Sequence, residues 1–194
     1  MYKSIYSSNL KYAPFMLPLL LLPLLGEWVW KLLSPEAFLA YRELTLVINI
    51  VYILIVRILL LDTMLFIFTR SHRKLHVALI RIVGLYLEIT VLTILYFALL
   101  YYLLGVFDIF HYNAAIATEA LTQIQSHGFI AALYISTVTF TTLGLGDWVP
   151  QTLNAMMAVS VEVILGVVQA GVFMAIIIYA LQNREVIEPN PHDS

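Results

Sequence analysis

Cysteine is absent from this chain of 194 residues. Its absence excludes a disulfide framework and thiolate chemistry, and it removes any clue to the redox compartment. Charged residues are scarce, at 11% of the sequence against about a quarter in soluble domains. The net charge is −2, and no basic patch indicates a nucleic-acid partner. The sequence also lacks a long internal repeat and a low-complexity linker.

Hydrophobic side chains, by contrast, make up 62% of the chain, and the mean hydropathy is +0.93. This is the composition of an integral membrane protein. Four segments contain the ~20 apolar residues that a spanning helix needs, and they are residues 12–33, 44–69, 76–107 and 152–181. The first is long for a signal peptide and no small-x-small cleavage site follows it. We therefore expect an all-α membrane protein with four transmembrane helices.

The basic loop RSHRKLH, at 70–76, predicts the orientation of these helices. Loops rich in lysine and arginine stay in the cytoplasm, so both ends of the chain are expected inside and the stretch 108–151 outside. Within that stretch, residues 128–141 form an apolar run that is too short to span a membrane. A run of this length suits a re-entrant helix, followed by backbone that lines a water-filled path.

The segment TLGLGD, at 142–147, follows this expected half-helix. Gly144 and Gly146 can adopt positive φ at no steric cost, and leucines alternate with them. Alternating handedness would turn successive carbonyl groups to one side, above the hydroxyl of Thr142. Several chains around one axis would then stack rings of oxygen, which can replace the hydration shell of a cation. The negative end of the half-helix dipole also favours a cation there.

Taken together, these features resemble the potassium channel family. Its members place a pore helix rich in hydroxyl residues before a Thr-x-Gly-x-Gly-Asp motif, and a proline follows shortly afterwards. In this chain the hydroxyl residues include Thr139 and Thr141, the motif is TLGLGD, and the proline is Pro150. Two positions differ from the usual pattern, because Leu143 replaces valine or isoleucine and Leu145 replaces the commonest residue, tyrosine.

The resemblance implies a role for individual residues. Thr139, Thr141 and Asp147 would support the filter, with Asp147 at its outer mouth. Gly166 falls where the family often has a flexible glycine, so it is either a hinge or a site of close helix packing. Dehydrated K⁺ would bind the filter residues Thr142, Leu143, Gly144 and Leu145, with Gly146 completing the filter.

The resemblance also implies a domain organisation. Residues 76–183 would form the pore domain with outer helix, pore helix, filter and inner helix. Residues 1–75 would supply two further helices and the basic loop, and residues 184–194 a short cytoplasmic tail. One pore loop cannot make a ring, so the implied assembly is a homotetramer in the lipid bilayer of the cell membrane. K⁺ would be its permeant ligand, with no cofactor and no enzymatic activity.

Two alternatives compete with a conducting channel. GLGD also occurs in GxGD-type intramembrane aspartyl proteases, which need a second aspartate, usually after an aromatic residue, and Asp108 follows Phe107. Asp108 and Asp147 sharing a proton could activate water. The chain is short for that family and has no Pro-Ala-Leu motif, which favours the channel. The other alternative is a non-conducting subunit that assembles with another channel.

Charged residues inside the expected spans include Arg57, Asp62, Glu88 and Glu162. An ionised side chain at the centre of a span costs ~2.5–3.5 kcal/mol on insertion scales, so each is expected to have a partner. The depths of Arg57, Glu88 and Glu162 overlap, which predicts that Arg57 pairs with Glu88 or Glu162. Such a pair either fastens helices together, or Glu162 lies behind the pore helix, bonds Thr139 or Thr141, and tunes filter gating.

Overall fold

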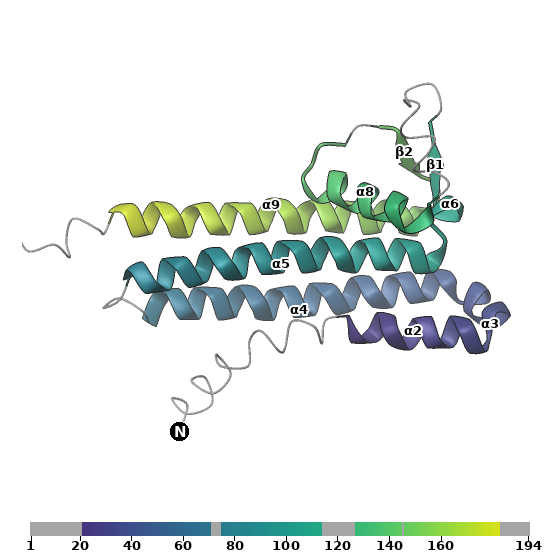
Figure 1. Ribbon diagram of the computed structural model, residues 1–194, viewed down its shortest axis with the longest axis horizontal. Helices are drawn as coiled ribbons and strands as arrows, with labels where there is room; N and C mark the ends of the chain where they lie inside the picture. Colours follow the sequence, from purple (N-terminus) through teal and green to yellow (C-terminus); the bar gives the residue numbers. More distant parts are fainter. Residues whose placement is uncertain (1–20, 71–74, 114–126, 145, 183–194) are drawn as a thin grey trace, which may run out of the picture.

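The computed structural model describes residues 21–70, 75–113, 127–144 and 146–182. In chain order the elements are α2 (Leu22–Leu33), α3 (Pro35–Ala40), α4 (Arg42–Arg70), α5 (Leu75–Leu104), α6 (Val106–Ile109), β1 (Phe110–Tyr112), α8 (Gly128–Phe140), β2 (Trp148–Pro150) and α9 (Leu153–Gln182). In Figure 1 the long helices labelled α4, α5 and α9 run side by side, and the short strands labelled β1 and β2 lie near one end of the bundle. We call this end the strand end.

Helices α4, α5 and α9 each contain a segment long and apolar enough to cross a membrane. These segments are Arg42–Leu60, Val83–Leu104 and Leu153–Tyr179. They agree with three of the four expected spans. For the first expected span, 12–33, the structure describes α2 alone, and residues 12–20 lie outside the described ranges. The expected tail at 184–194 lies outside them as well.

The third helix ends earlier than the sequence predicts, because the chain turns at Gly105. This glycine has φ +85°, a left-handed conformation that other residues adopt only with strain. A Cβ at this position would lie 2.4 Å from Oδ2 of Asp108. Gly105 therefore ends α5, and the short helix α6 redirects the chain into β1.

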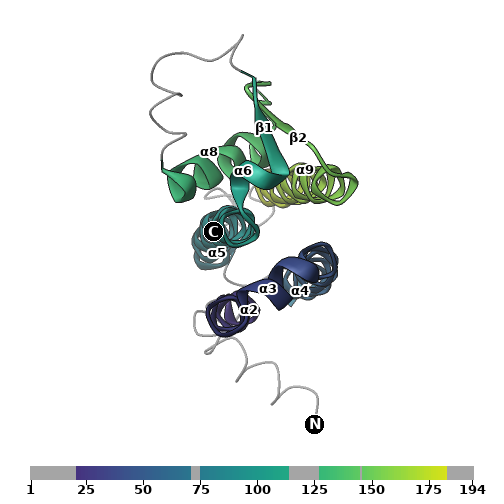
Figure 2. The same ribbon diagram turned by 90° about the vertical axis from the view of Figure 1, so that its right-hand side faces the viewer.

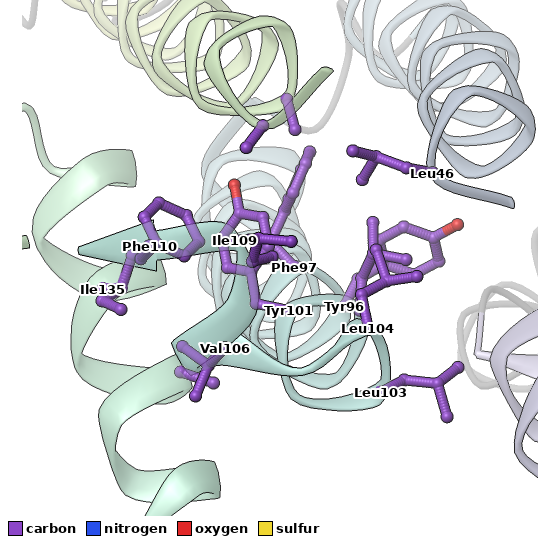
Figure 3. Packing of buried hydrophobic residues seen from close by; sticks show 14 of the residues in the cluster. Leu46, Tyr96, Phe97, Tyr101, Leu103, Leu104, Val106, Ile109, Phe110 and Ile135 are labelled. Carbon is purple, nitrogen blue, oxygen red and sulfur yellow. The ribbon is translucent and has the colours of Figure 1, made fainter. Parts of the chain in front are cut away.

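Helix α5 lies at the centre of the fold and contacts α2, α4, α8 and α9. Seen end-on in Figure 2, α2 and α4 lie on one side of α5, and α8 and α9 lie on the other. Tyr96, Phe97 and Tyr101 of α5 are fully buried. In Figure 3, Tyr101 lies beside Phe110 of β1, and their ring centroids are 5.0 Å apart. This aromatic core fixes α8 and β1 against the strand end of α5.

Strands β1 and β2 form an antiparallel pair that closes the strand end. Beyond the pair, the amide of Asn113 donates to the carbonyl of Asp147 at 2.6 Å, and the amide of Gln151 donates to that of Ile109 at 2.9 Å. The chain that follows α5 is thereby tied to the chain that precedes α9. The register pairs Phe110 with Pro150, His111 with Val149 and Tyr112 with Trp148.

Many large apolar side chains point away from the protein. Soluble monomers rarely expose contiguous apolar surface on this scale, whereas a lipid bilayer covers it. This surface agrees with the membrane location that the composition predicts. Examples from α4, α5 and α9 are Ile48, Val51, Ile55, Leu87, Val91, Ile164, Val167 and Ile178.

Candidate functional site

Helix α8 ends in a Schellman motif. Thr141 is the C-cap residue, and Thr142 follows it with a left-handed backbone. The amide of Thr142 donates to the carbonyl of Thr139 at 3.0 Å, and the amide of Leu143 donates to that of Val138 at 2.9 Å. This pair of bonds defines the motif, and it satisfies two carbonyls that a helix end would otherwise leave unpaired. It also fixes the direction in which the TLGLGD segment leaves α8.

A threonine occupies the left-handed position of this motif, where glycine is usual. Thr142 has φ +60° and is the single non-glycine residue with positive φ in the described part of the chain. For a residue with a Cβ this conformation costs roughly 1–2 kcal/mol, and a β-branched side chain makes it rarer still. Strain of this kind is concentrated at functional sites, where the surrounding structure maintains it.

Positive φ recurs at every second position of the TLGLGD segment. The φ angles are +60° at Thr142, +46° at Gly144 and +76° at Gly146, whereas Leu143 is not left-handed. The alternation expected from the spacing of the glycines is therefore present at these four positions. Leu145 lies outside the described residues, so the role expected for it stays a prediction.

One face of this segment is open. Thr141, Thr142, Leu143 and Gly144 are all exposed, and Leu143 has an exposed fraction of 65%. A Cβ placed on Gly144 would meet no atom within 4 Å. Within the described residues, nothing from the same chain covers this face, so it is available to ions or to another chain.

Asp147, at the end of the segment, is buried at 2% exposure. The hydroxyl of Tyr134 on α8 hydrogen-bonds its side chain; burial, and then this bond to the carboxylate, raise the pKa of Tyr134 to about 12. Tyr134 therefore remains a donor at neutral pH. Oδ2 of Asp147 is buried without a hydrogen-bond partner among the described residues. With its carbonyl bonded to Asn113, Asp147 ties the end of the segment to both α8 and the chain after β1.

Glu162 lies behind α8 and is fully buried. Its Oε2 accepts a hydrogen bond from Tyr101 of α5 at 2.8 Å, and its Oε1 lies 2.5 Å from Oγ of Ser136 on α8. The expected partners were Thr139 or Thr141, one turn nearer the end of α8. Ser136 and Thr139 share one face of α8, and the offset of α8 along α9 brings Ser136 to Glu162, whereas the Thr141 hydroxyl bonds a carbonyl within α8. Glu162 thus connects three helices.

Gly166 lies one turn after Glu162 on α9, and it meets α8 one turn after Ser136. A Cβ on Gly166 would lie 2.4 Å from the carbonyl oxygen of Phe140. Helix α9 continues unbroken through this glycine. Of the two alternatives that the sequence leaves for Gly166, close helix packing is the one that the structure shows. Helix α8 is thereby docked on α9 at two points that are one turn apart on both helices.

Residues 89–183 match the family whose description is "Ion channel". This part of the chain is therefore identified as an ion channel domain. The match agrees with the resemblance to potassium channels that the TLGLGD motif carries, and together with the three apolar helices it supports a membrane protein of the channel class. No curated protein and no solved structure matches the chain. The ion channel domain extends from α5 to α9, so it includes α8, the TLGLGD segment and both strands.

The ion channel domain contains both aspartates of the protease hypothesis, but the structure places them in different surroundings. The Asp108 side chain is 62% exposed and lies 3.5 Å from Arg42. Asp147 is buried and engaged with Tyr134. Two carboxylates must share a site before they can share a proton. The geometry and the family match therefore both disfavour the protease.

Outside the matched residues, Arg57 of α4 reaches into the ion channel domain. Arg57 is 4% exposed, and its Nη2 donates to Oε1 of Gln169 on α9. Gln169 in turn donates from Nε2 to Oγ1 of Thr90 at 2.7 Å and to the carbonyl of Tyr86 at 3.2 Å. One amide side chain thus joins α4, α5 and α9.

The predicted pairing of Arg57 with Glu88 or Glu162 is not what the structure shows. Within the described ranges no carboxylate forms an ion pair with Arg57. The two carboxyl oxygens of Glu162 instead contact Tyr101 and Ser136. Glu88 lies on α5 between the two residues that bond Gln169, and a helix turns 100° per residue, so it points to the opposite side.

The residues that complete the site were not evident in the sequence. Ser136 belongs to the hydroxyl-rich run, which is the signal that could have identified it. Tyr101 and Tyr134 are two of 12 tyrosines, and nothing in their local pattern distinguishes them. Their roles depend on which helices meet, which a single sequence does not display.

Proposed function

We propose that the chain is one subunit of a potassium-selective channel that passes K⁺ passively across the cell membrane. The observation that carries this proposal is the alternation of left-handed residues at Thr142, Gly144 and Gly146, directly after α8 and inside the ion channel domain. This backbone suits a filter, because alternating handedness aligns carbonyl groups along one side.

In this proposal, backbone carbonyl groups replace the hydration shell of the ion. The hydroxyl of Thr142 would add an oxygen at the inner end, which gives a reason for a strained threonine where glycine is usual. A single segment offers oxygens from one side alone, and its face is open in one chain. A homotetramer would supply the other sides. The coordinating carbonyls would belong to Thr142, Leu143, Gly144 and Leu145.

Helix α8 would act as the re-entrant pore helix. It has 13 residues, which are too few to span a membrane, and most of them are apolar. Its C-terminal end leads directly into the TLGLGD segment, so the negative end of its dipole would favour a cation beneath the filter. Such a helix satisfies its own backbone hydrogen bonds at membrane depth, and α5 and α9 pack against it.

Rigidity of the filter would come from the bonds around it. The two Schellman bonds fix its start, and Asp147 fixes its end through Tyr134 and Asn113. These bonds would replace the tie that the missing tyrosine at position 145 provides in related filters. They support a preference for K⁺ despite the leucines at 143 and 145.

The topology follows from the basic loop. Residues 70–76 would lie in the cytoplasm together with both chain ends, and the strand end of the bundle would lie outside. Helices α4, α5 and α9 would span the bilayer, and α2 with the residues before it would form the fourth span. The partners would be other copies of this chain, lipid and K⁺, with no cofactor.

Cation flux from proteoliposomes tests the proposal. Wild-type protein is measured with a K⁺ gradient and then with a Na⁺ gradient, beside Gly144→Ala and Gly171→Ala. A Cβ meets no atom within 4 Å at either glycine, but only Gly144 has positive φ, so the pair isolates the backbone conformation from steric clash. We expect K⁺ flux above Na⁺ flux in the wild type and in Gly171→Ala, and its loss in Gly144→Ala.

Other outcomes discriminate between the alternatives. Equal K⁺ and Na⁺ fluxes that Gly144→Ala abolishes would indicate a non-selective cation pore. No flux from the pure protein, together with a channel that copurifies with it, would indicate a non-conducting subunit. Flux that survives in Gly144→Ala would contradict a filter at this segment.

A further inference from the structure

The hydroxyl of Ser136 has two oxygen neighbours and one hydrogen. Its Oγ lies 2.9 Å from the carbonyl oxygen of Ile94 on α5 and 2.5 Å from Oε1 of Glu162 on α9. A serine hydroxyl donates once, whereas a main-chain carbonyl accepts only. If Ser136 donates to Ile94, its contact with Glu162 is a hydrogen bond only when Glu162 supplies the proton. Both contacts are favourable together when Glu162 is a neutral acid.

The second oxygen of Glu162 fits the same protonation state. Tyr101 donates to Oε2 at 2.8 Å, as it would to the carbonyl oxygen of a carboxylic acid. The neutral acid therefore completes a chain in which every hydrogen has one acceptor, from Glu162 to Ser136 and from Ser136 to Ile94. Satisfied networks of this kind hold buried helices in one arrangement.

The surroundings of Glu162 offer no compensating charge. The side chain is fully buried, and within the described ranges no lysine, arginine or histidine contacts it. Arg57 of α4 is engaged by Gln169, two turns further along α9. Tyr134, the one titratable residue of α8, bonds Asp147 instead. A carboxylate inside a membrane without a cation is costly, and giving it a proton removes that cost.

We propose that Glu162 carries a proton and, as a neutral acid, is the positioning residue that fixes α8 and the TLGLGD segment against α9. Its contact with Ser136 and the contact of Gly166 with Phe140 are two points at which α8 docks on α9. Loss of the proton places two acceptors against each other at Ser136 and a negative charge behind the filter. The effect on ion flux rests on the proposed function, whereas the protonation itself does not.

Two substitutions at position 162, to glutamine and to alanine, distinguish the role of the proton from the role of the whole side chain. The amide of glutamine places a donor and an acceptor where the neutral acid has them. Glu162→Gln therefore reproduces the protonated state at every pH, and Glu162→Ala removes both groups. Glu88→Gln is the matched control, since Glu88 is the other glutamate within this region of α5 and α9 and takes no part in the network.

The first measurement is the infrared spectrum of the purified protein. A protonated carboxyl group has a carbonyl stretch that a carboxylate lacks. We expect the difference between wild type and Glu162→Gln to contain this stretch at neutral pH. A difference that contains only carboxylate bands would overturn the proposal, whether or not the protein conducts.

The second measurement is K⁺ and Na⁺ flux as a function of pH. A group that acts in its protonated form works at low pH, and its contribution is lost as the pH rises through its own pKa. We expect selective flux of the wild type to fall at alkaline pH and that of Glu162→Gln to persist. In Glu162→Ala we expect the ratio of K⁺ flux to Na⁺ flux to fall about tenfold, which is the factor for one lost hydrogen bond.

Two outcomes decide the flux measurement. Persistence of flux in Glu162→Gln with loss in Glu162→Ala supports the proposal, while equal loss in both overturns it. If Glu162→Ala does not assemble, Ser136→Ala removes the partner hydroxyl and is expected to lower the flux ratio in its place. Absence of flux from wild-type protein in all conditions would contradict the proposed function, and the infrared arm would still decide the protonation.

Discussion

Gly166 of α9 and Phe140 of α8 meet without room for a side chain between them. A Cβ on Gly166 would lie 2.4 Å from the carbonyl oxygen of Phe140, and that atom belongs to the backbone, which cannot rotate away. Phe140 is the last residue of α8 and stands two positions before the TLGLGD segment. Any group added at Gly166 must therefore displace either α9 or the start of this segment.

We expect Gly166→Ala to lower both stability and flux. Overpacking of a close contact costs roughly 1–3 kcal/mol, more than the 0.5–1 kcal/mol that alanine gains over glycine in a helix. Gly171→Ala on the same helix is the control, because its Cβ would meet nothing within 4 Å. The midpoint of thermal unfolding of the assembled protein measures the effect. A Gly166→Ala protein as stable as Gly171→Ala would show that α8 and α9 adjust freely.

The strained backbone of Thr142 predicts that stability and function respond in opposite ways. Thr142→Gly relieves a left-handed conformation worth roughly 1–2 kcal/mol, and glycine's extra freedom in the unfolded chain offsets about half of this. We expect unchanged or higher thermal stability with reduced K⁺ flux, because the hydroxyl is lost. Thr142→Ser keeps the hydroxyl and should conduct. Wild-type flux from Thr142→Gly would mean that the threonine serves only to cap α8.

Tyr134 predicts a loss of stability at alkaline pH. Its pKa is raised from 10.0 to about 12, so the hydroxyl bonds Asp147 throughout the neutral range. The contribution to stability is complete below the ordinary tyrosine pKa and is lost as the pH rises towards the raised value. Tyr134→Phe should lose it at every pH, roughly 1–3 kcal/mol, because the buried carboxylate loses its donor. If the stability of the wild type and of Tyr134→Phe differs by the same amount at every pH across this range, the role of the bond is refuted.

Asp108 gives a direct test between channel and protease. The side chain is largely exposed and pairs with Arg42, and exposed ion pairs contribute only ~0–1 kcal/mol. Asp108→Asn should therefore leave ion flux and stability nearly unchanged. Asp147→Asn serves as the comparison, since that carboxylate is buried. Proteolytic activity that disappears in both variants would reinstate the protease hypothesis.

The parts of the fold that follow from local pattern could be predicted from the sequence. Three long apolar runs became α4, α5 and α9, and the apolar run at 128–141 became α8. The spacing of Gly144 and Gly146 predicted the alternation of handedness at TLGLGD. Each of these depends on residues close together in the chain, where hydrophobic length and glycine freedom decide the outcome.

Partner choice between helices could not be predicted in the same way. Depth alone suggested Glu88 or Glu162 for Arg57, but the rotation of each helix about its axis decides which side chains meet. That rotation is set by packing around the aromatic core of α5, which no local pattern reveals. Ser136 and Thr139 share one face of α8, so the offset of α8 along α9, which is also set by packing, brings Ser136 rather than Thr139 to Glu162.

Because of the contact between Arg57 and Gln169, we expect removal of Gln169 to destabilise the protein more than removal of Arg57. Gln169→Leu leaves a buried guanidinium with no acceptor among the described residues, and an uncompensated buried charge of this kind costs roughly 3–5 kcal/mol. Arg57→Met removes the charge and leaves an amide that still bonds Thr90 and Tyr86, so we expect a change below about 1.5 kcal/mol.

The double variant makes the test quantitative. When Arg57 is replaced by methionine, Gln169→Leu no longer leaves a buried charge without a partner. The double variant should therefore be more stable than Gln169→Leu alone. The interaction energy from the double-mutant cycle is expected to reach roughly 1–3 kcal/mol, measured from thermal unfolding in one lipid or detergent. Additive effects would mean that water or lipid solvates Arg57, and that α4 and α9 are joined by apolar packing alone.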